Sequence, residues 1–198
     1  MAASYHHGDL RQAFIDAALR GLDEDGELPS WRALARACAV SHTAPYRHFA
    51  NFQALHAAVS AAAFVRMTQA IGLAASSGTD PYERLARGLR AYIEFGRAHP
   101  SWYELMFGRR QIERDGESPS PAGIAAYDGL ISAIAACGVA GASNVAFTLW
   151  SAIHGVTDLA SSGRQAPVAR TSDADPFDDV IAMCLAHVRT AAQAAPAK

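Results

Sequence analysis

The chain has 198 residues, of which 51% are hydrophobic and 18% are charged, and its formal net charge is −2 at pH 7. This length is enough to bury an apolar core without disulfides or metals, and the near-neutral charge excludes a protein that coats nucleic acid without selectivity. The three cysteines lie far apart in apolar surroundings, so we expect free thiols in a reducing cytoplasm, with no metal site and no cofactor. The N-terminus lacks the pattern of a secretion signal and no apolar run is long enough to span a membrane, so no membrane partner is expected.

Alanine dominates the apolar residues, and runs of β-branched residues between turns are hard to find, which predicts an all-α fold. A first helix begins near Asp9, carries apolar residues at three- and four-residue steps, and ends at the glycine-containing DEDGE turn. Ser30 is expected to cap a short second helix, and Ser41 a short third helix after a connection of about three residues. A long helix begins after Asn51 and runs toward the SSGTD break.

Two Asp-Pro pairs, at Asp80 and Asp175, each predict a helix start, because aspartate caps a helix and proline fits its first turn. The first of these helices ends at Pro100, where a short aromatic segment, PSWYELMF, follows. The next stretch is polar and contains glycine and proline, which is typical of a loop. The remaining expected segments are the loop over residues 108–121 and helices over residues 122–137, 143–161 and 175–192.

The first half has the layout of a helix-turn-helix, in which two short helices are followed by a long one and the second short helix can enter the major groove of DNA. If Val40 and Phe49 point inward, the third helix presents hydrogen-bonding side chains outward. No acidic residue occurs between Glu27 and Asp80, so a phosphate backbone could approach this interval without meeting a carboxylate. The alternatives are a helical hairpin with a polar outer face and an acid-free interval that arises by chance.

The run SWRALARACAVSHTAPYRHFANFQAL resembles the helix-turn-helix of the TetR family of repressors in its capping serine, alanine-centred helix, Val-Ser turn and Tyr-x-His-Phe ending. YHHGDLRQAFIDAAL upstream and WSAIHG at residues 150–155 look like the branch of that family with a tryptophan-x-x-x-histidine-glycine element in its C-terminal domain. The resemblance implies a three-helix DNA-binding domain over residues 1–54 and a helical ligand-binding and dimerisation domain over residues 55–198. It further implies a homodimeric repressor that a small-molecule effector releases from double-stranded operator DNA.

The resemblance also assigns roles to the residues around the third helix. Thr43, Tyr46 and His48 would position the helix on phosphates, while His42, Ala44 and Arg47 would lie nearer the bases. Arg47 could read guanine or contact a phosphate. The expected DNA-binding residues are Arg32, Ser41, His42, Thr43, Ala44, Tyr46, Arg47 and His48.

The sequence departs from the family pattern at two places near this helix. Ala39 replaces the usual turn glycine, so the backbone there either avoids a positive φ or is strained. Phe52 and Gln53 replace a lysine and a glutamate, so one phosphate contact is missing; this lowers affinity unless Arg47 or the arm around residues 6–11 substitutes. An alternative function is therefore a helical ligand-binding or scaffold protein with weak or lost DNA binding.

Aromatic residues are concentrated in the second half, where most are expected to belong to the core. The resemblance implies a ligand pocket here, and His154, one turn after Trp150, would contribute a polar group to it. Alternatively, His154 is a buried histidine that hydrogen-bonds a carbonyl. The expected ligand-binding residues are Phe95, Trp102, Tyr103, Met106, Phe107, Tyr127, Trp150 and His154.

Two apolar stripes on the last two helices predict a dimer interface that packs as a four-helix bundle across a two-fold axis. Such a dimer would place two recognition helices about 34–36 Å apart, in successive major grooves. The expected interface residues are Val145, Leu149, Ile153, Val156, Val180, Ile181, Cys184, Leu185 and Val188. No nucleophile elbow, phosphate loop or metalloprotease motif occurs, so an enzyme is not expected. The sequence identifies neither the effector nor the operator, and it does not separate repressor from activator.

Overall fold

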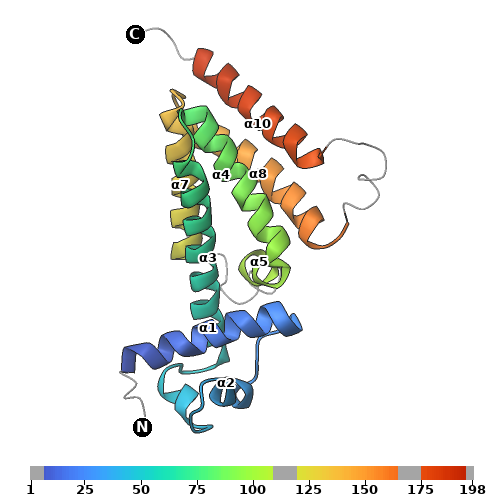
Figure 1. Cartoon of the computed structure of the whole chain (residues 1–198). Coiled ribbons are helices and arrows are strands. Elements are labelled where there is room, and N and C mark those ends of the chain that lie inside the picture. The colour runs from blue at the N-terminus through green and yellow to red at the C-terminus, as the bar shows by residue number, and fades with distance from the viewer. Residues whose placement is uncertain (1–6, 109–119, 165–174, 195–198) are drawn as a thin grey trace. The chain divides into compact units, whose positions relative to one another are not determined.

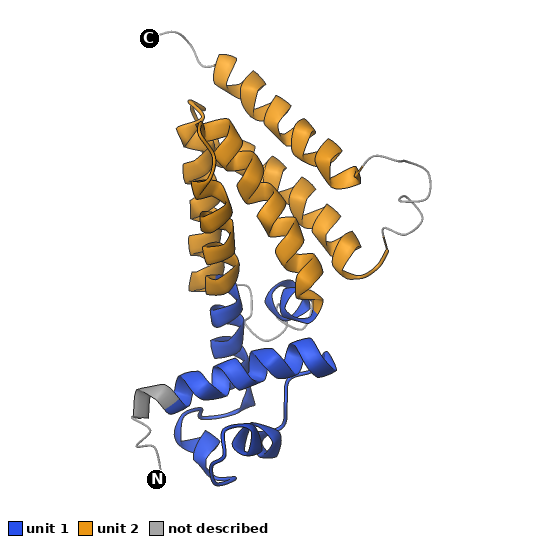
Figure 2. Ribbon diagram, viewed as in Figure 1, with its two compact units in different colours: residues 1–64, 101–118 blue, residues 65–100, 119–198 orange. Residues whose placement is uncertain are grey.

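The computed structural model describes residues 7–108, 120–164 and 175–194, with side chains from residue 10 onward. Every regular element in these ranges is a helix, which confirms the predicted all-α fold. The chain forms two compact units (Figure 2): unit 1 comprises Met1–Phe64 and Ser101–Ser118, and unit 2 comprises Val65–Pro100 and Pro119–Lys198. Unit 1 therefore extends beyond the predicted domain over residues 1–54 and includes a later segment of the chain.

Unit 1 contains the predicted helix-turn-helix region together with a short aromatic helix (Figure 1). Apolar side chains spaced three or four residues apart form its core, and Phe14, Leu19, Leu34 and Leu55 are fully buried. The predicted cap of the second helix is confirmed, because the Ser30 hydroxyl accepts a hydrogen bond from the Ala33 amide at 3.3 Å. Its elements are α1 (His7–Asp25), α2 (Trp31–Ala37), η1 (Ala44–Arg47), the first half of α3 (Phe52–Ser76), and α5 (Pro100–Phe107).

The long helix α3 corrects one expectation from the sequence. By length and composition it is apolar enough to cross a membrane, whereas no such run was expected. A core helix of a protein in water meets the same test, and Leu55, Val59 and Ala63 of α3 are fully buried in the protein. Helix length and hydropathy alone therefore do not separate these two environments.

In its described residues, unit 2 contains four helices and the second half of α3. α8 is its central element, since it packs against α4, α7 and α10. Ile93, Ile134, Leu149 and Val188 are almost completely buried and come one from each of these helices. The bounds are α4 (Pro81–Ala98), α7 (Pro121–Ala136), α8 (Ala142–Ser161) and α10 (Pro176–Gln193).

Both Asp-Pro pairs start helices as predicted. The Asp80 carboxylate accepts a hydrogen bond from the Glu83 amide at 2.9 Å, and Asp175 accepts one from the Phe177 amide at 3.0 Å. Asp175 is also paired with Arg90 of α4 at 2.9 Å, so the residue that caps α10 ties this helix to α4.

Candidate nucleic-acid interface and regulatory residues

The turn between the two short helices is closed by backbone hydrogen bonds at the end of α2. The Ala39 amide donates to the Arg36 carbonyl and the Val40 amide to the Ala35 carbonyl, both at 3.0 Å. This pattern is a Schellman motif, which places the residue after the cap in the left-handed region. Ala39 has a φ of 54°, so of the two alternatives left by the sequence, the strained backbone is the one observed.

The segment after this turn (residues 41–49, hereafter the reader segment) contains one short 3₁₀ helix, η1, and no longer helix. The prediction that Ser41 caps it is wrong. Thr43 is the N-cap, neither side chain caps the helix, and the Ser41 and Thr43 hydroxyls share a hydrogen bond of 3.2 Å. Pro45, in the first turn of η1, has no amide proton to offer, while its carbonyl accepts from the His48 and Phe49 amides.

The reader segment presents most of the predicted DNA-binding side chains to solvent. Tyr46 is 57% exposed, whereas Phe49 is buried as expected and Val40 is half-buried. His48 is half-buried against Phe14, with ring centroids 5.7 Å apart. Of the predicted set, Arg32, Ser41, His42, Thr43, Tyr46 and Arg47 are exposed, and Ala44 and His48 are half-buried.

An aromatic cluster around Trp31, which no sequence pattern indicated, holds the reader segment. The Trp31 ring lies 5.1 Å from Tyr46 and 6.4 Å from Phe49, between centroids. It also meets Phe52 edge to face at 5.6 Å. Since such ring pairs add about 0.5–1.5 kcal/mol each, side-chain packing supplies rigidity that a one-turn helix lacks. Phe52 stands where the family pattern has a lysine, and it contributes packing in place of a charge.

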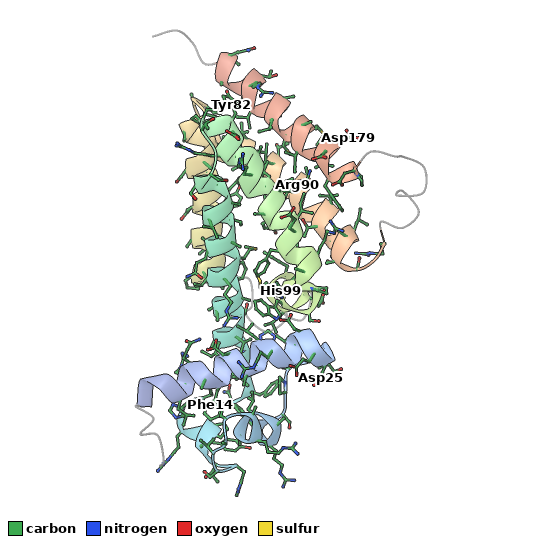
Figure 3. All side chains as sticks on the ribbon, in the orientation of Figure 1. Phe14, Asp25, Tyr82, Arg90, His99 and Asp179 are labelled. Carbon is green, nitrogen blue, oxygen red and sulfur yellow. The ribbon has the colours of Figure 1, made fainter. Side chains whose placement is uncertain are left out.

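Four acidic residues of unit 1 lie together in the DEDGE turn. The acidic residues of the DEDGE turn lie at one end of the helix, and Figure 3 shows Asp25 there, away from Phe14. Among the described residues, no carboxylate pairs with Arg32, Arg36 or Arg47. These guanidinium groups are therefore available to an anionic partner.

The predicted ligand-binding residues divide between the two units. Trp102, Tyr103, Met106 and Phe107 lie on α5, in unit 1. Trp102 is buried, and its indole donates a hydrogen bond of 3.0 Å to the Leu19 carbonyl of α1. Phe107 packs against Phe64 at 5.2 Å and against Tyr103 at 4.8 Å.

The other four lie in unit 2, three of them in one cluster. Trp150 lies 5.0 Å from the His154 ring and 6.0 Å from Tyr127, between centroids. His154 Nδ1 lies 3.1 Å from the hydroxyl of Tyr92. A phenol is thus a hydrogen-bonding partner of this histidine, whereas the alternative from the sequence named a carbonyl. Burial lowers the pKa of His154, which favours the neutral imidazole, while Asp158 acts weakly in the opposite direction. The cluster joins aromatic surface with a neutral polar group.

Unit 2 also has an open groove of about 370 Å³, which contains none of the predicted ligand-binding residues. It lies among α3, α4 and α10. Its lining residues are Ala74, Ser77, Ala86, Arg87, Arg90, Ala91, Glu94, Asp178 and Ile181.

The structure places most of the predicted dimer-interface residues inside unit 2. Val145, Leu149, Ile153, Ile181, Cys184 and Val188 are buried within the single chain, and Val156, Val180 and Leu185 are half-buried. The reason is that the apolar stripes of α8 and α10 meet each other and neighbouring helices. On the outer surfaces of these helices, Phe147, Leu159 and Met183 are exposed instead.

Comparison with known proteins gives consistent results. Residues 85–188 match the family model described as "Tetracyclin repressor-like, C-terminal domain". A structure of a protein of unknown function from Rhodococcus sp. RHA1 is 31% identical, covers 97% of this chain and 100% of its own, and has a TM-score of 0.73. No curated protein matches the chain in sequence.

Two more distant structures share the fold. BioQ, solved with its double-stranded DNA operator, is 23% identical, with 93% of this chain and 98% of that chain covered and a TM-score of 0.59. A TetR variant from Acinetobacter baumannii AYE, in complex with minocycline, is 18% identical, with 98% and 100% covered and a TM-score of 0.59.

Proposed function

The chain belongs to the TetR family of transcriptional regulators, and from this premise we propose that it binds operator DNA through the reader segment and responds to a small molecule. The observation that carries the proposal is the reader segment itself. Tyr46 and Arg47 are exposed and follow a rigid turn, and the Trp31 cluster fixes their position. In BioQ, which has the same fold, the bound partner is a double-stranded operator.

The DNA test begins with a pool of random-sequence duplexes from which the protein selects its preferred site. Arg47→Ala is then compared with Arg20→Ala, which removes an equal charge from α1. If Arg47 contacts a base, Arg47→Ala should lower the affinity for the selected site roughly 5- to 150-fold and relax the base preference at one position of that site. If Arg47 contacts a phosphate, the substitution should lower the affinity for all duplex sequences. Equal small effects of both variants would contradict the proposal.

The alternative function, a helical ligand-binding or scaffold protein, is favoured by Phe52, which supplies no charge to a phosphate. The two functions differ in one measurement. A regulator binds duplex at low salt and loses affinity steeply as salt rises, whereas a scaffold shows no such binding. A reporter gene placed behind the selected site, in the cytoplasm of a bacterial host, then separates repression from activation.

For the effector, we propose the cluster of Trp150, His154 and Tyr127 as one contact region. Aromatic faces beside a neutral hydrogen-bonding group suit a planar, mostly apolar molecule with a polar substituent. A thermal-shift screen of aromatic compounds tests this, with release of the selected duplex as the second readout. A compound that stabilises the wild type and Trp150→Leu equally does not bind at this cluster.

We further propose a homodimer whose interface is the outer face of α8 and α10. Phe147 is 62% exposed and Met183 56% exposed, while Ser151 and Gly155 beside Phe147 on α8 are small and exposed, which allows close approach of a second helix. Analytical ultracentrifugation of the wild type and Phe147→Asp tests the proposal. The wild type is expected to sediment as a dimer and the variant as a monomer; a monomeric wild type at tens of micromolar would refute it.

A further inference from the structure

The reader segment has a cationic neighbour on α1. The guanidinium carbon of Arg11 lies 5.1 Å from the centroid of the Phe49 ring, which is a cation–π arrangement. Phe14, one turn further along α1, meets the same ring at 6.4 Å. The face of α1 that carries both residues is therefore packed against the end of the reader segment.

Phe49 gives Arg11 a fixed position relative to the reader segment. Its ring is almost completely buried, and its amide donates to the Pro45 carbonyl of η1 at 3.1 Å. Arginine is planar and carries five N–H donors, so a guanidinium that lies on an aromatic ring still directs its edge toward a partner in solvent. The Phe49 ring thus orders the side chain and leaves its hydrogen-bonding edge exposed.

The charge of Arg11 is not neutralised within the described ranges. Its side chain is exposed and forms no ion pair there. In unit 2, Arg87, Arg90 and Arg164 are paired with carboxylates, whereas Arg97 and Arg189 lie over aromatic rings as Arg11 does. In the part of the chain that the structure describes, Arg11 is thus an ordered guanidinium without an ion pair, next to the exposed reader segment. Such a group is suited to bind one anion of a regular series on the surface of a partner.

We propose that Arg11 binds a backbone phosphate of the duplex that the reader segment contacts. The inference rests on the proposed DNA-binding function and adds a residue of α1 to it. Phe52 and its neighbours Asn51, Gln53 and Ala54 leave the start of α3 without a cation, and Arg11 supplies a positive charge over Phe49 instead. Its role is to position the reader segment on the duplex, because a contact with a phosphate gives no information about the base sequence.

The test is the salt dependence of binding to a random-sequence duplex and to the selected duplex. For Arg11→Gln, the slope of log affinity against log salt should decrease by about 0.9 per subunit, which is a roughly 3.5-fold change per contact across a fourfold range of salt. Arg11→Lys should restore the slope, since it keeps the charge. Arg20→Gln, on the same helix, is the matched control and should leave the slope unchanged.

Two outcomes would overturn the inference. If Arg11→Gln lowers the melting temperature but leaves the slope at its wild-type value, Arg11 only packs on Phe49. If Arg11→Gln and Arg20→Gln reduce the slope equally, the effect is one of net charge and not of a contact. If the wild-type protein binds no duplex even at low salt, the proposed function itself is refuted. This outcome is seen with the wild type alone, before any variant is made.

Discussion

Replacement of Ala39 by glycine should stabilise the protein. Ala39 has a φ of 54° and its methyl group is exposed, so the substitution removes backbone strain without loss of packing. A left-handed conformation costs a non-glycine residue about 1–2 kcal/mol, and glycine costs about 0.4–1 kcal/mol through the greater freedom of the unfolded chain. The net gain in the free energy of unfolding therefore lies between about 0 and 1.6 kcal/mol, with a midpoint of about 0.8 kcal/mol.

Ala37→Gly is the matched control, because Ala37 is also exposed and lies two residues earlier, in the last helical position of α2. Glycine in a helix costs up to about 1 kcal/mol relative to alanine, so the two substitutions should have opposite signs. For a chain of this size, 1 kcal/mol corresponds to roughly 2–4 °C in melting temperature. Thermal unfolding followed by tryptophan fluorescence measures both, since Trp31 lies at the start of α2. Equal destabilisation by the two variants would show that the turn is not left-handed at Ala39.

Three further substitutions test the packing and capping described above. Burial lowers the pKa of His154 below its ordinary value of 6.5. The stability that the neutral imidazole allows is therefore fully present above pH 6.5 and is lost as the pH falls through the folded-state pKa. A plot of melting temperature against pH should be flatter for His154→Gln than for the wild type. Asp80→Ala removes the N-cap of α4 and should cost about 1 kcal/mol in urea unfolding, and an unchanged midpoint would contradict the assigned cap. Trp102→Phe leaves the Leu19 carbonyl without its indole donor and should cost about 1–3 kcal/mol, whereas Trp150→Phe, with a half-buried ring, should cost less.

The helix boundaries were predictable because their signals are local. Asp80 and Asp175 each precede a proline, and both cap helices as the sequence indicated. The reader segment was less predictable. Ser41 and Thr43 can both cap a helix, and Pro45 permits either an α-helical or a 3₁₀ first turn, so three neighbouring residues leave the conformation open.

The packing partners of a side chain were not predictable, since they depend on tertiary structure. Trp31, Tyr46 and Phe52 come from three separate segments, and no spacing rule brings their rings together. The stripe of Val145 and Leu149 shows the same limit in another form. Its period predicts an apolar face on a helix, but not whether that face meets the same chain or a second copy. In this protein it meets the same chain, as the burial of Leu149 shows.

The division of the predicted ligand-binding residues between the units bears on how an effector would act. An effector changes DNA affinity only through unequal affinity for the binding-competent and incompetent states. α5 belongs to unit 1, where Trp102 is bonded to α1, and α1 packs on Phe49 at the end of the reader segment. A ligand that displaces α5 therefore disturbs a short series of direct contacts that ends at the proposed DNA-binding residues. A ligand at Trp150 touches none of these residues, so its effect must pass through the spacing of the proposed dimer or through α3, which contributes residues to both units.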